Sequence, residues 1–303
     1  YQAGSLLDRV VRWSPRPAVR AATLLGLAAV VLFIWTVNLS LPDGKLHVVL
    51  LDVGQGDAIF VQGPSGEQVL IDGGPDPRLA LRALGERMPF WDRTLDLVVL
   101  THHDEDHLAG LPEVLRRYRV AAVLDNPYPK DSQAAVEWGA MLGREGATVV
   151  EAREGQVVRL GNDLVIEVLN PPDPLISGTA SDANNNSTVL RLRYGDVSFL
   201  LMGDVHRDAE TSMMSRNLDM ESTVLKVAHH GSGSSTSEAF LDYVQPRLAM
   251  VSSGRENSFG HPRLLVVERL QNAVGKEMLF ITAEQGTVEV TTDGDRLWVV
   301  TQR

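Results

Sequence analysis

Five predicted strands of this chain each end in an acidic residue or a histidine. The strands are short apolar runs separated by Gly and Pro, and stretches with helical periodicity, such as residues 77–88 and 111–118, lie between them. Their terminal residues, in chain order, are Asp52, Asp72, His102, Asp204 and His229. If the strands run in one direction, their carboxyl ends meet at one edge of an α/β fold, which is where such folds build their sites.

The densest of these strand ends is the sequence THHDEDH, residues 101–107, which follows the apolar run LDLVVL. It contains three histidines and three acids, with no Lys or Arg. A solvated turn explains one such end but not easily five. His102, Asp104, Asp106 and His107 would repel and desolvate one another unless cations lay between them. The loop therefore favours a pair of metal ions over a solvated turn.

Each ion needs more ligands than one loop provides. We predict Asp204 as a carboxylate shared by both ions and His229 as a further ligand, with His230 as a proton donor or phosphate contact. Two divalent ions can activate water and stabilise the attacking and leaving oxygens of a phosphoryl displacement. The many oxygen ligands favour Mn²⁺ and leave Zn²⁺ open.

Composition limits the alternatives. The chain has no cysteine, which excludes disulfides, thiolate metal sites and a cysteine nucleophile. Its formal charge is -11, and without the four arginines and one aspartate of residues 1–42 the remainder holds 24 basic and 38 acidic residues, a balance of -14. Such a surface is unfavourable for a polyanion, because Lys and Arg normally contact the phosphates. Bound divalent cations would offset only part of this charge.

Residues 21–42 contain no charged side chain, and about 20 apolar residues span a bilayer core as a helix. We predict a transmembrane helix there, a basic cytoplasmic flank over residues 1–20, and a hydrolase domain over residues 43–303 on the extracytoplasmic side of the cell membrane. A signal peptide or a buried core helix is the alternative. Because the chain begins with Tyr1, we expect it to be a portion of a longer protein.

Several motifs together carry a family resemblance. The spacing of residues 102–107 resembles the H-x-H-x-D-H motif of metallo-β-lactamase-like hydrolases, with Asp104 at the second histidine position. With LDVGQGDAIFV (51–61), LIDGG (70–74), LLMGDV (200–205), LKVAHHGS (225–232) and NSFGHP (257–262), the chain closely resembles the C-terminal domain of ComEC proteins. These are channels through which competent bacteria take up DNA. The resemblance covers about residues 45–290.

The resemblance implies an α/β fold, an αββα metallo-β-lactamase-like sandwich, preceded by one transmembrane helix. It also implies a two-metal phosphodiesterase that degrades the DNA strand left outside the cell, and a channel portion of the same longer chain as partner. The ligand motifs correspond to His102, Asp104, Asp106, His107, Asp204 and His229. One motif differs, because residues 184–187 read NNNS where many relatives have a histidine. The first metal would then lack a ligand or be held through Asn or water.

Other polar residues allow two interpretations each. Asp57 fits either the site or a tight turn, and Lys226 fits either a phosphate contact or a solvent-facing strand position. Asp72, like Asp52, is expected to orient a ligand histidine, although Asp72 could itself be a ligand. His261 fits a general acid or a helix cap. By contrast, His47 and His206 are expected to be ordinary strand and helix-start residues.

The favoured function is a metal-dependent nuclease that acts on DNA during natural transformation. Two alternatives remain. The acidic balance favours a small or cell-wall phosphodiester as substrate, and the missing motif histidine favours a non-catalytic domain that guides DNA to the channel. The run GSGSS, residues 231–235, lacks the G-x-S-x-G spacing of a serine hydrolase.

Overall fold

The computed structural model describes residues 17–39, 41–143 and 146–303, and the chain separates into two compact units, 1–41 and 42–303. The described part of the first unit is helix α2 (Pro17–Leu39), which begins four residues before the predicted span. Its segment Pro17–Trp35 has a mean hydropathy of 2.1 and is not buried against protein. Length and composition thus make α2 a candidate membrane span. Residues 1–16 of the predicted basic flank lie outside the described residues.

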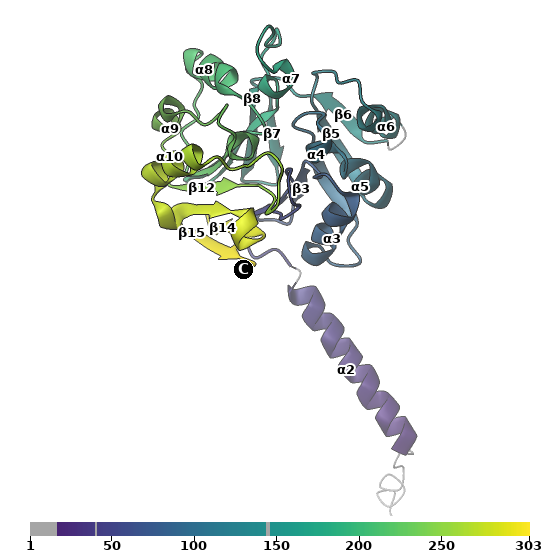
Figure 1. The fold of residues 1–303 in the computed structure, drawn as a ribbon. Coiled ribbons are helices and arrows are strands. Elements are labelled where there is room, and N and C mark those ends of the chain that lie inside the picture. The colour runs from purple at the N-terminus through teal and green to yellow at the C-terminus, as the bar shows by residue number, and fades with distance from the viewer. Residues whose placement is uncertain (1–16, 40, 144–145) are drawn as a thin grey trace, which may run out of the picture. The chain divides into compact units, whose positions relative to one another are not determined.

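The second unit contains two mixed sheets (Figure 1). From edge to edge, the eight-stranded sheet has β15 (Leu297–Thr301), β14 (Val288–Thr292), β1 (Leu46–Leu50), β2 (Ile59–Gln62), β3 (Gln68–Ile71), β4 (Thr94–Val99), β5 (Arg119–Asp125) and β6 (Thr148–Glu151). The seven-stranded sheet has β13 (Leu279–Ile281), β12 (Leu248–Val251), β11 (Val224–Lys226), β10 (Val197–Leu201), β9 (Val189–Tyr194), β8 (Leu164–Asn170) and β7 (Val157–Leu160). The strand-rich pattern of the sequence is therefore two sheets rather than one.

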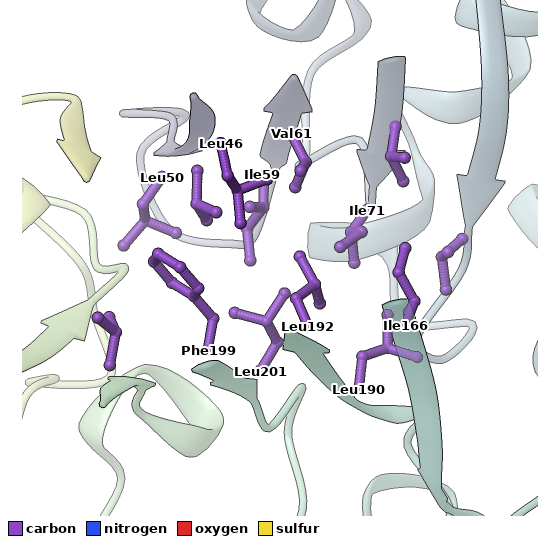
Figure 2. Close-up of a cluster of buried hydrophobic side chains, with 14 of the residues drawn as sticks. Leu46, Leu50, Ile59, Val61, Ile71, Ile166, Leu190, Leu192, Phe199 and Leu201 are labelled. Atoms are coloured by element: carbon purple, nitrogen blue, oxygen red, sulfur yellow. The ribbon is translucent and has the colours of Figure 1, made fainter. Parts of the chain in front are cut away.

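An apolar core lies between the sheets (Figure 2). It forms because side chains alternate between the two faces of a strand. On β1, Val48 and Leu50 point into this core, while Val49 belongs to the layer on the opposite face. Phe199 of β10 is completely buried in the same core. Truncation of such a ring typically costs about 3–5 kcal/mol, so the contact between the sheets supplies much of the stability of the domain.

Helices cover the outer face of each sheet. Helices α3 (Pro77–Arg87), α5 (Leu111–Arg117) and α6 (Gln133–Leu142) pack on the first sheet; α8 (Arg207–Ser215), α9 (Glu238–Val244) and α10 (Leu264–Val274) pack on the second. Single-turn elements are α4 (Glu105–Leu108), α7 (Asp182–Asn185), η1 (Ala228–Gly231), η2 (Lys276–Met278) and α11 (Thr282–Gln285). The layers are thus helix, sheet, sheet, helix, and the predicted αββα sandwich is confirmed.

Both sheets have a parallel half. Strands β3 to β6 are parallel in the first sheet, and β10 to β13 are parallel in the second. The parallel strands β3 and β4 end before Asp72 and the 101–107 loop, while β10 and β11 end before Asp204 and His229. This arrangement brings the predicted ligand residues together where the two sheets meet, as the common strand direction requires.

Two connections near the site have specific structures. The hairpin between β9 and β10 turns at Gly195 and Asp196, with Gly195 at a φ of 58°. The long polar segment 171–187 is ordered by side-chain amides rather than by an apolar core. Asn186 accepts a hydrogen bond from Ile176 N and donates to Ile176 O, and Asn170 donates to Asn185 O and Ser187 O. These bonds position α7 beside the loop that follows β10.

Candidate metal centre

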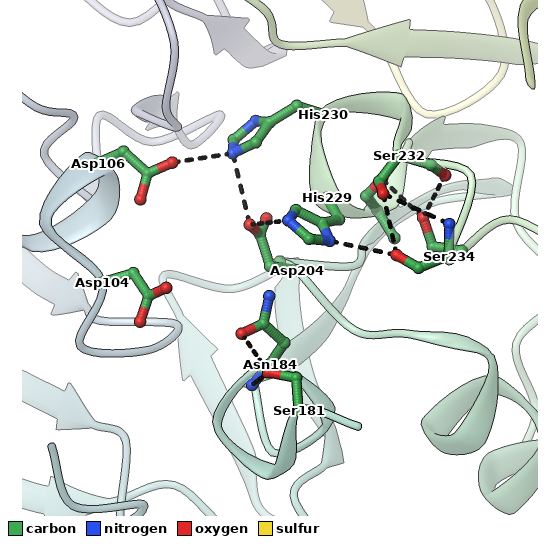
Figure 3. A network of polar contacts seen from close by, with 12 residues as sticks. Asp104, Asp106, Ser181, Asn184, Asp204, His229, His230, Ser232 and Ser234 are labelled. Carbon is green, nitrogen blue, oxygen red and sulfur yellow. Dashed lines mark hydrogen bonds and ion pairs between the residues drawn. The ribbon is translucent and has the colours of Figure 1, made fainter. Parts of the chain in front are cut away.

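A cluster of acidic and histidine side chains lies where three segments of the chain meet (Figure 3). The loop after β4 and helix α4 provide Asp106 and His107, the loop after β10 provides Asp204, and η1 provides His230. One ligand-type atom from each of these four residues lies within 4.8 Å of the other three. The four come from three regions of the sequence, so only the fold brings them together.

Asp204 is at the middle of this cluster. Its carboxylate oxygens lie 3.4 Å from His107 Nε2 and 3.4 Å from His230 Nε2. His230 Nε2 also lies 3.3 Å from Asp106 Oδ2. Asp204 is almost fully buried, and its own backbone N–H donates to Ser187 Oγ. A buried carboxylate facing several imidazoles is well suited to bridge two cations.

A second group of donors lies on another side of Asp204. His102 Nε2 is 3.9 Å from Asp204 Oδ2 and 3.8 Å from Asp104 Oδ2. His229 Nε2 is 3.7 Å from the same Asp204 oxygen. Asp104 is less buried, and Lys130 Nζ donates to it at 2.6 Å. The other five predicted ligands therefore lie around the carboxylate of Asp204, and His230 joins them.

The hydrogen bonding of these atoms fits a metal site. Among the described residues, four buried atoms of the cluster have no hydrogen-bond partner: His102 Nε2, His107 Nε2, His230 Nε2 and Asp204 Oδ1. A buried polar atom without a partner costs roughly 1–3 kcal/mol, so several facing one another need an explanation. Imidazole nitrogens and carboxylate oxygens are ligands for Zn²⁺ and Mn²⁺. The residues present thus fit a divalent metal centre.

The charge balance gives the same result. Five carboxylates face the centre, from Asp57, Asp72, Asp104, Asp106 and Asp204, whereas Lys130 and Lys226 are the lysines that pair with them. Buried charges are costly unless opposite charges compensate them. Divalent cations would provide this compensation in place of protons on His107 and His230.

His107 is held by Asp72. Asp72 Oδ2 accepts a hydrogen bond from His107 Nδ1 at 2.7 Å, and Thr101 donates to both Asp72 oxygens through its N–H and hydroxyl. This bond leaves the lone pair of His107 on Nε2, which faces Asp204. Asp72 itself has a φ of 58°, an uncommon conformation for a residue other than glycine. Its position suits the expected orienting carboxylate.

His230 is held from its other side by a buried ion pair. Lys226 is completely buried and its ammonium group donates to Asp57 Oδ2, while Asp57 Oδ1 lies 3.4 Å from His230 Nδ1. His230 Nδ1 also lies 3.1 Å from Ser252 O. A lysine with no exposed surface does not reach a substrate phosphate. The expected phosphate contact of Lys226 is therefore replaced by a role in fixing Asp57 and His230.

The GQG turn, residues 54–56, approaches the ligand loop closely. A Cβ atom on Gly56 would lie 2.1 Å from Asp106 O, and Gly56 has a φ of 136°. Asp57 N–H donates to the same carbonyl at 3.2 Å. The glycine is thus required both by its conformation and by the contact with Asp106. The two interpretations of this motif, turn and site, apply together.

The histidine pair is in an unusual backbone conformation. His229 has φ 48° and ψ 47°, and His230 has φ 53° and ψ 24°. Two consecutive left-handed residues other than glycine are costly, and such strain is found mainly at functional sites. The conformation lets both rings approach Asp204 from different directions (Figure 3).

His206 was expected to be an ordinary residue, but it contacts the centre. Its Nε2 lies 2.9 Å from His229 Nδ1, and the two rings are stacked with centroids 4.9 Å apart. Asn184, the first residue of the NNNS segment that lacks the motif histidine, lies with Nδ2 3.5 Å from the same His206 atom. Its Oδ1 accepts from the Ser181 hydroxyl. The position two residues after Asp204 was the one sequence signal that could have indicated His206.

Two expected residues lie elsewhere. Asp52 pairs with Arg303 and accepts no hydrogen bond from a histidine among the described residues. It therefore does not orient a ligand histidine in this structure. His261 lies at the edge of the centre, with its ring 5.6 Å from that of His229. Burial and the neighbouring His229 lower the pKa of His261 to about 4. A neutral imidazole at pH 7 is a poor general acid.

The centre strongly perturbs its histidines. Burial lowers the pKa of His102 to about 4, and repulsion by His107 contributes. For His107 and His230, burial opposes the charged form, but Asp204 and its neighbours outweigh burial and raise the pKa of both well above the usual value. Burial likewise opposes ionisation of Asp204, but His230 and His107 lower its pKa. Cations compete with these protons, so metal binding at the centre releases them.

Comparison with known proteins agrees with this geometry. The family model of the metallo-beta-lactamase superfamily matches residues 51–255. ComE operon protein 3 of Bacillus subtilis is 34% identical over 250 residues, covering 74% of this chain and 30% of that protein. Recombination protein 2 of Haemophilus influenzae is 32% identical over 254 residues, covering 83% and 29%. Competence protein ComA of Neisseria gonorrhoeae is 28% identical over 236 residues, covering 78% and 30%.

The chain thus spans about 30% of the length of these relatives. Solved structures show the same fold at low identity. The metallo-beta-lactamase fold protein YhfI of Bacillus subtilis superposes with a TM-score of 0.52 at 11% identity, covering 84% of this chain and all of that one. Zn²⁺-bound PqqB of Methylobacterium extorquens gives 0.52 at 12%, covering 80% and 99%. The chain therefore belongs to the metallo-beta-lactamase superfamily and is a relative of the ComEC-type competence proteins.

Proposed function

We propose that this chain is a divalent-metal-dependent phosphodiesterase that cleaves DNA during its uptake. One observation carries the proposal: the unpartnered buried nitrogens of His102, His107 and His230 face the single carboxylate of Asp204. The names of the relatives, which include competence proteins, support DNA as substrate. Degradation of the strand that stays outside the cell is part of the proposal.

The ligands divide into two sets in this proposal. Asp106, His107 and His230 would hold one ion, since His230 Nε2 lies within 3.4 Å of both Asp106 and Asp204. His102, Asp104 and His229 would hold the other, and Asp204 would bridge. His230 changes from the expected proton donor to a ligand because its Nε2 points to the carboxylates. Mn²⁺ suits the oxygen-rich set, and Zn²⁺ suits the histidines.

The chain's own residues orient this centre. Bound divalent ions would supply charge stabilisation at the phosphate and activate the attacking water. Asp72 holds the Nδ1 proton of His107, so that Nε2 is free to bind. The Lys226 and Asp57 pair holds His230 in the same way from the opposite side. Lys130, half exposed beside Asp104, is the cation best situated to meet a phosphate oxygen at the rim.

The proposed location follows from α2. The helix would cross the cell membrane with the basic flank in the cytoplasm and the hydrolase domain outside, as the positive-inside rule indicates. The channel portion of a longer chain would be its partner. The lengths of the relatives support this, because the chain matches about 30% of each.

The test is cleavage of linear single-stranded and double-stranded DNA by the chain in detergent, with Mn²⁺ or Zn²⁺ added. Metal-dependent cleavage that Asp106→Ala abolishes would support the proposal. The matched control is Asp92→Ala, since Asp92 is a partly buried acid that binds Gln68 and Thr94 away from the centre. Absence of cleavage by a folded, metal-loaded chain would contradict the proposal.

The charge balance of -14 over residues 43–303 favours one alternative substrate, a small phosphodiester. Methyl p-nitrophenyl phosphate tests it in the same assay. Hydrolysis of this ester without cleavage of DNA would favour the small substrate. Cleavage of neither, with metal bound, would favour a domain that guides DNA without cutting it.

A further inference from the structure

The loop between β12 and α10 carries an exposed aromatic ring beside the metal centre. Phe259 is 59% exposed, and its ring stacks on His261 with centroids 5.8 Å apart and planes at 24°. His261 in turn contacts His229 edge to face, at 5.6 Å. Ring contacts therefore run outward from a proposed ligand to a phenylalanine whose other face is open to solvent.

The loop that carries Phe259 is held in place. Asn257 donates to Gly254 O at 2.7 Å and to His261 O at 2.6 Å, and it accepts from His261 N–H at 2.9 Å. A Cβ on Gly231 would lie 2.5 Å from Pro262 Cβ, so this loop packs tightly on η1. The aromatic ring is thus preorganised, which reduces the entropic cost of binding a ligand.

Two arginines that form no ion pair with a described residue lie beside the loops near this ring. Arg207 donates to Gly233 O at 3.0 Å, and Arg263 packs near Gly233 and Gly260. Within the described part of the chain, neither guanidinium lies within 4.0 Å of a carboxylate, and the same is true of Arg255 on the Phe259 loop. In contrast, many other arginines of the domain pair with acids. These are Arg78, Arg82, Arg87, Arg116, Arg117, Arg153, Arg191, Arg193, Arg216, Arg296 and Arg303.

We propose that these residues form a subsite for a single strand of nucleic acid, in which a base stacks on Phe259 and the flanking phosphates contact Arg207 and Arg263. Proteins that bind single strands combine stacking platforms with cationic grooves in this way. Arg207 and Arg263 provide positive charge near the centre of an acidic domain. A base in a duplex is already stacked on its neighbours, so the subsite selects unpaired bases. This inference rests on the proposed function.

A lipid surface is the other partner that exposed apolar and cationic side chains suit, since Leu264 and Leu265 are also more than 70% exposed. The ring contacts favour nucleic acid. They connect Phe259 to His229, so a membrane docked on this face would cover the approach to the centre.

The test is binding of fluorescein-labelled oligothymidylate of about 12 nucleotides to the whole chain in detergent, with EDTA present, followed by fluorescence anisotropy. No hydrolysis occurs under these conditions, so the result is independent of the proposed nuclease activity. Phe259→Ala is expected to weaken binding about tenfold, as loss of one stacked base does. The control Phe90→Ala removes a still more exposed phenylalanine from another loop and should bind as the original chain.

Two further measurements do not depend on that variant. An oligonucleotide of the same length with abasic sites should bind the original chain more weakly, and Phe259→Ala should bind it no worse. Arg207→Gln and Arg263→Gln should each reduce the slope of log affinity against log salt by about 0.7, the value for one single-strand phosphate, whereas Arg82→Gln should not. Equal binding of abasic and normal strands would overturn the proposal.

Phe259→Trp separates the lipid alternative. Quenching of the added tryptophan by oligothymidylate, beyond that of the unsubstituted chain, supports the subsite. Quenching by brominated lipid in nanodiscs, without quenching by the oligonucleotide, would overturn it. If the nuclease proposal alone fails, these binding results remain and the metal-dependent cleavage is absent.

Discussion

Two groups of histidine and carboxylate side chains in this domain have opposite properties. At the metal centre, three histidine Nε2 atoms face Asp204 with no hydrogen-bond partner among the described residues. On strands β1 and β14, His47 donates through both ring nitrogens, to Glu289 at 2.9 Å and to Asp43 at 3.0 Å, and Arg87 also pairs with Glu289. In the His47 group, both ring nitrogens of the histidine have a carboxylate partner. At the metal centre, the three histidine Nε2 atoms have no hydrogen-bond partner within the described part of the chain.

The comparison separates two roles that a sequence pattern does not distinguish. A histidine beside an acid is a local salt bridge when each polar atom has a partner within the protein. It is a candidate ligand when its free nitrogen is buried, lacks a partner and faces other ligand-type atoms. His47 is 23% exposed at its side chain, while His107 is completely buried. Variants in the two groups should therefore behave differently.

Asp204→Ala should abolish tight metal binding. Asp204 contacts both proposed sets of ligands, so its loss removes the bridge and should lower Mn²⁺ affinity by more than 100-fold, the upper range for a residue that only supports a ligand. Titration calorimetry with Mn²⁺ measures this effect. Asp43→Ala in the His47 group is the control and should bind Mn²⁺ like the original chain; equal losses in the two variants would remove the distinction.

Glu289→Gln should make the free energy of unfolding depend less on pH in the acidic range. The hydrogen bond from His47, with help from Arg87, lowers the pKa of Glu289 from 4.5 to about 2. A lowered folded-state pKa stabilises the protein above pH 4.5, and this stabilisation is lost as the pH falls towards 2. The shift corresponds to about 3 kcal/mol at most.

Urea unfolding at a series of pH values measures this contribution as the difference between the two chains. His47 has the opposite sign, since Glu289 raises its pKa above 6.5; its contribution is present below pH 6.5 and is lost as the pH rises through the raised value. If the two chains lose stability in parallel between pH 4.5 and 2, the His47 group is not the internal ion pair described here.

Asp72→Asn should reduce metal affinity by about 10- to 100-fold without abolishing it. The amide can still accept the His107 Nδ1 hydrogen bond, but it removes the charge that favours a strongly donating Nε2. Mn²⁺ titration of this variant beside Asp92→Asn measures the effect. An affinity unchanged by Asp72→Asn would show that His107 does not need its carboxylate partner to bind metal.

His206→Leu should have the smallest effect, about tenfold at one metal site. His206 Nε2 lies 2.9 Å from His229 Nδ1, and as an unprotonated acceptor it holds the Nδ1 proton and leaves His229 Nε2 free to bind. His206→Gln places an acceptor at a similar position and should retain most of the affinity. If Leu and Gln reduce the affinity equally, the role of His206 is packing rather than orientation of His229.

Much of the fold could be predicted from local patterns. The strand runs, the helices at 77–87 and 111–117 and the hairpin at Gly195 follow from apolar periodicity and turn chemistry. The six expected ligands were found because each follows a strand end. These are local properties, so a single amino-acid sequence is sufficient to predict them.

The partners of the site residues could not be predicted. Lys226 pairs with Asp57 across 169 positions, and Asp52 pairs with Arg303 across 251. Alternation on β11 suggested that Lys226 faces solvent or phosphate, but the strand is buried on both faces and the lysine is completely covered. His206 joined the centre through a contact with a loop 23 residues away.

The sequence by itself determined which residue types end the strands, the uncharged helix near the N-terminus and the layered α/β class, because periodicity and residue chemistry are written along the chain. Only the tertiary structure decided which of those residues face Asp204 and which nitrogen of each histidine is free. The physical reason is that a side chain can bind a metal only where its donor atom has no hydrogen-bond partner within the protein. Whether such a partner is present depends on neighbours that folding brings from distant parts of the chain.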